Sequence, residues 1–325
     1  MAEFDLIDRI RARATGRDDI VLGIGDDAAL LRMPAGHELV VTADTLNAGI
    51  HFPEDAVATD IGWKALAANL SDLASMGARP AWCTLSLSLP RADPAWLEGF
   101  LDGFLELAVQ HGIALVGGDT TRGPLSIAVT AMGHVEAGAA LRRDRARVGD
   151  DIWVTGTLGD AAGALVLGGY LPAPSDRVPG ADAGALSFLA ARLGRPTPRV
   201  DAGRALLGLA HACADVSDGL LADLGHICVR SGVGAEVELP ALPLSPALAA
   251  VFGTDASPLQ AAGGDDYELC FTAPPSLGEA VRMALEQAQV EATRIGRVVA
   301  GEGVRALDAD GGTWQPERGG YVHFR

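Results

Sequence analysis

The sequence contains a single lysine, Lys64, among its 25 basic residues. A P-loop requires a lysine after its second glycine, and a protein kinase requires a strand lysine that contacts the phosphates. Lys64 lies in the helical pattern WKALAANLSDLA, and no glycine-rich loop precedes it. The sequence therefore excludes both of these common phosphoryl-transfer machineries.

Cysteine pairs, long apolar runs and positive charge are also scarce. The four cysteines have no CxxC spacing, which favours small, reduced core residues. No 18-residue apolar run occurs, and the first residues, MAEFDLIDRIRAR, contain acids and no apolar block. We therefore expect no membrane span, no signal peptide and a cytoplasmic location. The formal net charge of −17 argues against a nucleic-acid partner.

The length of 325 residues favours two domains, and strand and helix patterns alternate along the chain. In the first half we predict strands at 38–44, 81–89, 113–119 and 125–135, and helices at 55–76 and at 94–111, the latter capped by Asp93. The basic, turn-like segment LRRDRARVGDD then interrupts the alternation of strands and helices, and we place a domain boundary near residues 143–150.

The second half repeats the alternation. We predict a strand at 151–156, then a strand, turn and helix in ACADVSDGLLADLGHICVRSG, and further strands in AEVEL, YELCFTA and ATRIGRVVAG. Residues 170–200, rich in proline and glycine, are predicted to be a surface excursion. The predicted fold class is α/β (α+β), with two domains and much antiparallel sheet.

The stretch VLGIGDDAALL, residues 21–31, matches the G-x-G-x-x-A pattern of a dinucleotide-binding turn. Asp26 and Asp27 stand where the phosphates would lie, and two carboxylates repel a polyanion unless a cation lies between them. The chain also reaches Pro34 too soon for a crossover helix. Both features argue against a dinucleotide-binding turn, and they leave a metal ion or no ligand as the alternatives.

Aspartates recur where an apolar strand or a tight turn ends. They are Asp26 and Asp27 in GIGDD, Asp44 in VVTAD, Asp119 in LVGGD, and Asp215 and Asp218 in ACADVSDG. Each of them alone has an ordinary explanation as a turn former or a helix cap. Asp72 fits that explanation less well, because it lies in an apolar helical pattern three residues after Asn69, and an unpaired carboxylate there is costly.

The turn that follows Asp215 leaves two interpretations open. Gly219 opens a helix, and the N-terminus of that helix either holds a phosphate or is capped by Ser217.

Brought together in space, these carboxylates would repel one another unless cations joined them. Hard oxygen ligands suit Mg²⁺, which shares its remaining positions with water and phosphate oxygens. The pattern therefore indicates a polyphosphate that is bound through several magnesium ions. Arg122 and Arg143 are the candidate protein cations.

Seven motifs resemble the thiamine-monophosphate kinase family of the aminoimidazole-ribonucleotide-synthetase-like ATP-binding superfamily. In chain order they are GIGDDAAL, TADTLNAGIHF, NLSDLASMGARP, GGDTTRGPLSI, WVTGTLGD, DVSDGLLADLGHI and GGDDYELCFT. The resemblance implies ATP-dependent phosphorylation of thiamine monophosphate to thiamine diphosphate, with several Mg²⁺ ions and ATP as co-substrate. It also implies a homodimer formed through the mixed sheet of an ATP- and magnesium-binding domain, residues 1–145, and an α/β domain, residues 146–325, that completes the active cleft.

The resemblance also implies roles for individual residues, none of them a general base. The positions that match metal ligands are Asp27, Thr42, Ala43, Asp44, Asp72, Asp119, Asp215 and Asp218. The positions that match ATP contacts are Gly118, Asp119, Arg143 and Ser217. The positions that match contacts to thiamine monophosphate are His51, Asp265 and Tyr321.

Two of these positions depart from the family pattern. Ala43 stands where relatives often carry threonine, so a metal contact there must come from its backbone carbonyl. Asp265 stands where GGEDYE is common, which shortens the acid by one methylene group. Without the resemblance, His51 would be interpreted as a structural histidine, Tyr321 as a packing residue of the tail and Arg143 as a solvated arginine.

Two alternative functions stay open. One is a selenophosphate-synthetase-like enzyme, which is disfavoured because no cysteine precedes Cys83. The other is a non-catalytic protein that binds a thiamine phosphate or a nucleotide.

Overall fold

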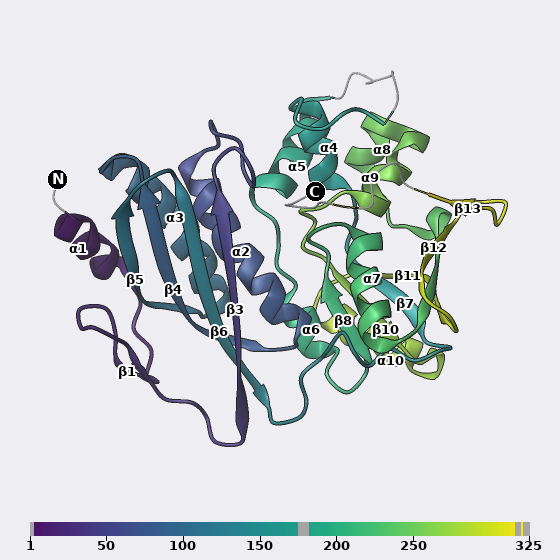
Figure 1. Ribbon diagram of the computed structural model, residues 1–325, viewed down its shortest axis with the longest axis horizontal. Coiled ribbons are helices and arrows are strands. Elements are labelled where there is room, and N and C mark those ends of the chain that lie inside the picture. The colour runs from purple at the N-terminus through teal and green to yellow at the C-terminus, as the bar shows by residue number, and fades with distance from the viewer. Residues whose placement is uncertain (1–2, 175–181, 316–319, 321–325) are drawn as a thin grey trace. The chain divides into compact units, whose positions relative to one another are not determined.

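The computed structural model describes residues 3–174, 182–315 and 320, which form two compact units (Figure 1). Unit 1 comprises Met1–Leu73 and Ala78–Ala140, and unit 2 comprises Ala74–Gly77 and Leu141–Arg325. Within the described residues, no helix has the length and apolar character needed to cross a membrane.

Unit 1 is built on a four-stranded sheet with the strand order β3-β6-β4-β5. The strands are β3 (His37–Asn47), β4 (Arg79–Leu89), β5 (Ala114–Arg122) and β6 (Ser126–Glu136). The pairs β3–β6 and β4–β6 are antiparallel and β4–β5 is parallel. Helices α2 (Ala58–Ser75) and α3 (Pro94–His111) lie on one face of this sheet (Figure 1). The predicted strands and helices of this half are confirmed.

Helix α3 begins and ends as the sequence predicts. The carboxylate of Asp93 accepts a hydrogen bond from the backbone N–H of Trp96 at 3.2 Å, and Pro94 occupies the first turn. Gly112 ends the helix in the left-handed conformation, with a φ of 62°.

The segment before this sheet consists of helix α1 (Glu3–Arg13) and the short antiparallel strands β1 (Ile20–Leu22) and β2 (Leu30–Leu31). The GIGDD turn joins β1 to β2, and no helix follows it. A dinucleotide-binding turn requires that helix. The structure therefore confirms the rejection of the dinucleotide-binding interpretation.

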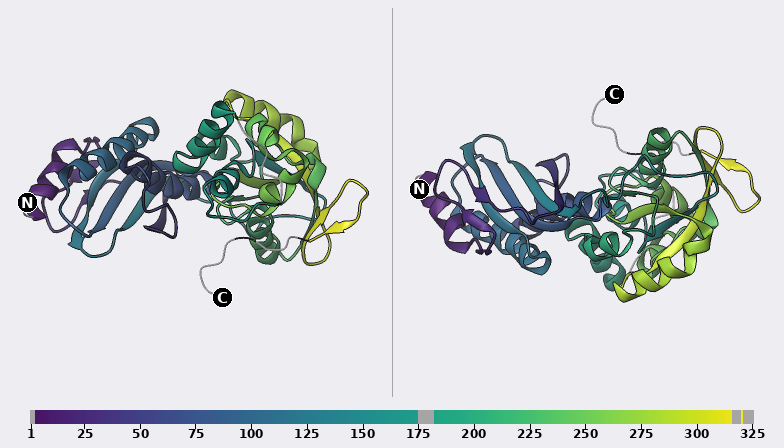
Figure 2. Two further views of the ribbon diagram at one scale, coloured as in Figure 1. Left: turned by 90° about the horizontal axis from the view of Figure 1, so that it is seen from above. Right: turned by 90° about the horizontal axis from the view of Figure 1, so that it is seen from below.

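Unit 2 is built on a seven-stranded sheet with the order β13-β12-β9-β11-β7-β10-β8. The strands are β7 (Asp151–Thr155), β8 (Ala212–Asp215), β9 (Gly234–Glu238), β10 (Leu269–Ala273), β11 (Ala292–Val299), β12 (Gly303–Leu307) and β13 (Thr313–Trp314). Among the described residues of this sheet, only the β9–β12 pair is parallel. Helices α7 (Leu220–Ser231) and α10 (Gly278–Gln287) lie on opposite faces of the sheet (Figure 2).

The remaining helices of unit 2 are shorter or lie beside the sheet. They are α4 (Asp160–Leu167), α5 (Ala183–Gly194), α6 (Val200–Ala205), α8 (Pro246–Phe252) and α9 (Ser257–Ala262), with 3₁₀ turns η1 (Leu239–Ala241), η2 (Gly253–Ala256) and η3 (Pro275–Leu277). Helices α4, α5, α8 and α9 share an apolar cluster of their own.

The prediction of a surface excursion over residues 170–200 is wrong for α5. Asp182 caps this helix by accepting from the backbone N–H of Ala185 at 2.7 Å. Ala185 and Leu189, one turn apart, are buried against α4 and α8. The flanking prolines and glycines obscured the helix because its stability comes from this tertiary packing.

All four cysteines are free and buried, which confirms the expectation of reduced core residues. Burial raises the pKa of Cys228 to about 11, so its thiol is a weak nucleophile.

Helices α2 and α3 approach so closely that a glycine is required at their contact. A Cβ atom on Gly103 would lie 1.8 Å from the carbonyl oxygen of Thr59. We expect Gly103→Ala to lower the free energy of unfolding by about 2 kcal/mol or more, because the two helices must move apart. Gly99→Ala is the matched control, since its Cβ would lie 3.4 Å from the Cβ of Ala58. Denaturant unfolding of both variants tests this expectation, and equal stabilities would contradict it.

Candidate active site

Two predicted metal positions of unit 1 are in direct contact. Strand alternation places Thr42 and Asp44 on the face of β3 that is turned toward α2. The hydroxyl of Thr42 donates a short hydrogen bond to the carboxylate of Asp72 on α2. The backbone N–H of Asp44 donates to the side-chain oxygen of Asn69 at 3.2 Å, and the Asn69 amide donates to the carbonyl of Ala65. The structure therefore brings Thr42, Asp44 and Asp72 together.

Ala43 and Asp119 lie on the other face of the same sheet. Thr45, Ala128, Ser86 and Asp119 are paired in one row across the four strands. Directly paired residues share a face, so Asp119 is turned to the same side as Ala43 and Thr45 and away from Asp44. Three strand spacings, roughly 14 Å, separate β3 from β5.

This separation is too large for one ion to be shared within the chain. Two oxygens bound to the same Mg²⁺ lie within about 4 Å of each other. Asp44 and Asp119 of one chain are therefore not ligands of the same metal ion.

The glycine before Asp119 has a structural reason of its own. Gly118 has a φ of 149°, and a Cβ atom there would lie 1.8 Å from the carbonyl oxygen of Leu85 on β4. Glycine at this position lets β5 approach β4, and this requirement does not depend on a ligand. Arg122, at the end of β5, is exposed.

The GIGDD turn and His51 are the other candidates in unit 1. Asp26 and Asp27 are both exposed, and Asp26 accepts from the backbone N–H of Asp27 at 2.8 Å. His51 Nδ1 accepts from the backbone N–H of Asn47 at 2.9 Å. In the neutral imidazole the proton is then on Nε2. His51 therefore has a structural contact that closes the turn after β3, as the alternative interpretation expected.

In unit 2, the turn between β8 and α7 is held by an acid that the sequence analysis did not single out. The backbone N–H groups of Ser217, Asp218 and Gly219 all donate to one carboxylate oxygen of Asp223, at 3.0–3.1 Å. Ser217 does not cap the helix with its side chain, so that interpretation is wrong. Since these three donors already have an acceptor, they are not available to a phosphate.

Asp223 is also close to another predicted metal position. Asp218, Asp223 and His226 each offer a ligand atom, and these atoms lie within 4.8 Å of one another. Burial and the charge of Asp218 raise the pKa of Asp223 to about 7, although its three backbone hydrogen bonds act in the opposite direction. The spacing of Asp223 and His226, three residues apart on a helix, was the sequence signal for this group.

Asp215 and Arg143 form an ion pair within unit 2. An Arg143 guanidinium nitrogen lies 3.8 Å from Oδ1 of Asp215, which is buried at the end of β8. Arg143 itself is 43% exposed. The two predicted positions are thus adjacent, and Arg143 has a buried acidic partner although its side chain is partly exposed.

Asp265 lies beside the turn between β8 and α7. Its backbone N–H donates to the carbonyl of Ser217 at 2.9 Å, and its carboxylate accepts from the hydroxyl of Tyr267 at 3.1 Å. Tyr321 lies outside the described residues.

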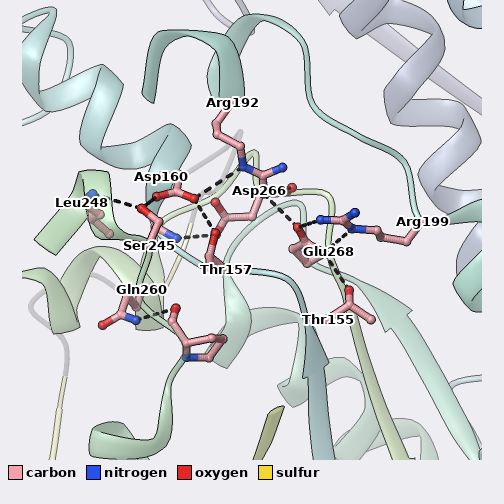
Figure 3. Close-up of polar contacts among 12 residues, drawn as sticks. Thr155, Thr157, Asp160, Arg192, Arg199, Ser245, Leu248, Gln260, Asp266 and Glu268 are labelled. Carbon is pink, nitrogen blue, oxygen red and sulfur yellow. Dashed lines mark hydrogen bonds and ion pairs between the residues drawn. The ribbon is translucent and has the colours of Figure 1, made fainter. Parts of the chain in front are cut away.

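The sequence analysis missed a buried ion cluster around Glu268 (Figure 3). Glu268 is fully buried directly before β10 and accepts from both Arg192 and Arg199. Both arginines come from the segment that was predicted to be a surface excursion. Glu268 belongs to the motif GGDDYELCF, which the sequence analysis quoted, but nothing in the sequence indicated its two arginine partners.

The donor atoms of unit 1 suit magnesium. Aspartate carboxylates and a threonine hydroxyl are hard oxygen donors, and no cysteine or histidine belongs to the Thr42–Asp44–Asp72 group. The described residues therefore fit the metal that the sequence predicts.

Comparison with known proteins agrees with this geometry. Residues 25–135 match the N-terminal domain and residues 147–308 the C-terminal domain of AIR synthase related proteins. A thiamine-monophosphate kinase of Haemophilus influenzae is 44% identical over 302 residues, covering 92% of this chain and 89% of that protein. The chain belongs to the thiamine-monophosphate kinase family.

Solved structures give the fold of this kinase family. The thiamine-monophosphate kinase of Stenotrophomonas maltophilia K279a has a TM-score of 0.85 and 59% identity, covering 96% of this chain and 97% of that one. AaThiL complexed with AMPPCP and TMP has a TM-score of 0.78 and 31% identity, covering 99% and 97%. The predicted family and the two-domain fold class are confirmed.

The Asp223 carboxylate should stabilise unit 2 of this kinase-family protein through its three backbone contacts. We expect Asp223→Ala to lower the free energy of unfolding by about 2–4 kcal/mol, because three N–H groups lose their shared acceptor. His226→Ala, on the exposed side of the same helix, should change it by less than about 0.5 kcal/mol. Denaturant titration of the two variants measures both values. A stability of Asp223→Ala equal to that of the parent would disprove the role.

Proposed function

We propose that this chain transfers the γ-phosphoryl group of ATP to the phosphate of thiamine monophosphate, giving thiamine diphosphate and ADP. This reaction is the last step of thiamine diphosphate biosynthesis. The observation that carries the proposal is the Thr42–Asp44–Asp72 group, in a chain that matches thiamine-monophosphate kinases over nearly its full length.

The chemistry of this transfer demands little covalent participation from the protein. A phosphate oxygen of thiamine monophosphate attacks the γ-phosphorus in line, and the bond to the bridging oxygen of ADP breaks. The attacking oxygen is already anionic at neutral pH, so no general base is required. The protein must bring two anions together and stabilise the charge on the transferring group.

The side chains that would hold magnesium are prepared for this task. The proposed ligands are Asp27, Thr42, the backbone carbonyl of Ala43, Asp44, Asp72, Asp119, Asp215 and Asp218. Bound magnesium supplies positive charge that offsets the repulsion between the phosphates. The hydroxyl of Thr42 fixes the Asp72 carboxylate, and Asn69 fixes the backbone of Asp44. Ligands that are held in this way need little reorganisation when the cation binds.

The remaining assignments stay predictions. They are the ATP contacts of Gly118, Asp119, Arg143 and Ser217, the thiamine monophosphate contacts of His51, Asp265 and Tyr321, the division of tasks between residues 1–145 and 146–325, and the cytoplasmic location.

A direct assay tests the proposed reaction. Purified protein is incubated with ATP, Mg²⁺ and thiamine monophosphate, and thiamine diphosphate is followed by fluorescence after oxidation to thiochrome. We expect equal amounts of thiamine diphosphate and ADP, with none when Mg²⁺ is omitted or when free thiamine replaces the acceptor. Binding without product would instead support a non-catalytic protein, and the absence of any interaction with thiamine monophosphate would indicate another acceptor.

In the same assay, Asp44→Asn and Asp72→Asn should each lower kcat by about 100-fold or more, because a neutral amide is a poorer magnesium ligand and leaves charge uncompensated in the transition state. Asp102→Asn on the exposed side of α3 is the control for a lost surface carboxylate. Normal turnover of Asp44→Asn at ordinary Mg²⁺ would contradict the metal assignment.

We further propose that the chain acts as a homodimer in which Asp119 serves the metal site of the other subunit. Asp44 and Asp119 of one chain face opposite sides of the sheet. Leu39 and Val41 on the edge strand β3 are 50% and 54% exposed, on the same face as Asp119. An apolar, exposed sheet face favours a second sheet as its cover.

Mixing two inactive variants tests this arrangement. Asp44→Asn and Asp119→Asn should each be inactive alone, since every site in each homodimer lacks one ligand. After the subunits are mixed and exchanged, half of the dimers are mixed, and each has one intact site. About one quarter of the parent activity should therefore return. No recovery in a mixture that contains mixed dimers would show that each site is built from one chain.

A further inference from the structure

The segment Gly263–Glu268, between α9 and β10, has a strained backbone. Asp265 and Tyr267 have φ values of 66° and 52°, in the left-handed region that side chains other than glycine rarely adopt. Among the described residues only Gln289 shares this property. Such a conformation costs about 1–3 kcal/mol per residue and persists only where the surroundings enforce it.

One side of the segment is held by the turn before α7. The backbone N–H groups of Asp265 and Tyr267 donate to the carbonyls of Ser217 and Val216, at 2.9 and 2.8 Å. The N–H of Val216 donates in return to the carbonyl of Glu268 at 2.8 Å. These bonds fix the path of the backbone beside two predicted site residues, Ser217 and Asp265.

The other side is held by buried charges, which Figure 3 shows. The Glu268 carboxylate accepts two hydrogen bonds from Arg199, both at 2.6 Å, one from Arg192 at 2.9 Å and one from the hydroxyl of Thr155 at 2.7 Å. The same hydroxyl of Thr155 accepts from the N–H of Leu269 at 2.8 Å. We call Glu268, Arg192, Arg199 and Thr155 the Glu268 clamp.

Two buried residues, Asp266 and Tyr267, connect this clamp to Asp265. Asp266 and Glu268 are 1% and 0% exposed and are turned into unit 2, whereas Asp265 between α9 and Asp266 is only half-buried. Asp266 accepts from the N–H of Gly159 at 2.8 Å, and burial raises its pKa well above the ordinary value. Tyr267 directly precedes Glu268, and its hydroxyl donates to the Asp265 carboxylate at 3.1 Å. A shift of the backbone at Glu268 would therefore reach the Asp265 carboxylate through Tyr267.

We propose that the Glu268 clamp is a positioning device that sets the affinity for the phosphorylated acceptor by fixing Asp265. This inference rests on the proposed function, in which Asp265 contacts thiamine monophosphate. Arg192, Arg199 and Thr155 all contact Glu268 and act through the segment that Glu268 anchors. A substitution in the Glu268 clamp should therefore change the KM for thiamine monophosphate and leave the KM for ATP unchanged.

Arg199→Lys is the principal variant, because it keeps the charge that Glu268 needs and loses the paired hydrogen bonds. We expect the KM for thiamine monophosphate to rise about tenfold, since small misplacements of a binding group are costly, while the KM for ATP stays within about twofold. Thr155→Val should act in the same direction, and Thr155→Ser, which keeps the hydroxyl, should restore the parent value.

Two controls separate positioning from general destabilisation. Asp151→Asn breaks an ion pair with Arg294 elsewhere in unit 2 and should change neither KM. Asp265→Asn removes the carboxylate, and asparagine tolerates the left-handed conformation. In that background, Arg199→Lys should cause no further rise in the KM for thiamine monophosphate.

Other outcomes would overturn the proposal. A lower melting temperature with both KM values unchanged would leave the clamp a purely structural feature. Equal rises in both KM values, or a full effect of Arg199→Lys in the Asp265→Asn background, would show that it does not act through Asp265. Failure of the proposed function is seen separately, because the parent protein would then form no thiamine diphosphate. In that case, thiamine monophosphate binding measured by calorimetry replaces the KM, with the same expected differences.

Discussion

Carboxylates that lie close together before a cation binds need hydrogen-bond donors from the protein itself. Unit 1 supplies them at the joint between β3 and α2, where Thr42 and Asn69 hold Asp72 and the backbone of Asp44. Unit 2 supplies them at the turn before α7, where three backbone N–H groups converge on Asp223. In both units an acid is fixed by short-range hydrogen bonds from an adjoining element. The rest of each site depends on this restraint.

The same principle extends to the interior of unit 2. A carboxylate taken out of water is tolerated only when cations and donors surround it, and Glu268 has two arginines and a threonine. Such a cluster is a poor source of net stability, because desolvation offsets much of the attraction. Its directional bonds instead specify one backbone path. That path includes two left-handed residues, which places the strain beside the proposed acceptor site.

Local signals in the sequence were sufficient for much of the fold. Asp93, Pro94 and Gly112 mark the ends of α3 because capping involves only neighbouring residues. The helical spacing of Asn69 and Asp72 likewise indicated one polar face on α2. Helix α5 was missed because its buried face is only complete against α4 and α8.

The features of the site that depend on long-range pairing could not be predicted from the sequence. The motifs identified Asp44 and Asp119 equally well, yet their opposite orientations follow from the register of four strands, which no short motif encodes. Glu268 stood in a visible motif, but Arg199 lies 69 residues away.

The near-absence of lysine has a consequence for how this protein would respond to acidity. The cations around Glu268 are guanidinium groups, which stay protonated at any pH at which the protein is folded. A phosphate monoester, by contrast, changes charge near pH 6. Across that range the two arginines keep their charge while the acceptor loses or gains a proton. A change in acidity therefore alters the charge of the acceptor and of the Asp223 carboxylate, whose pKa is raised to about 7, but not that of the guanidinium groups around Glu268.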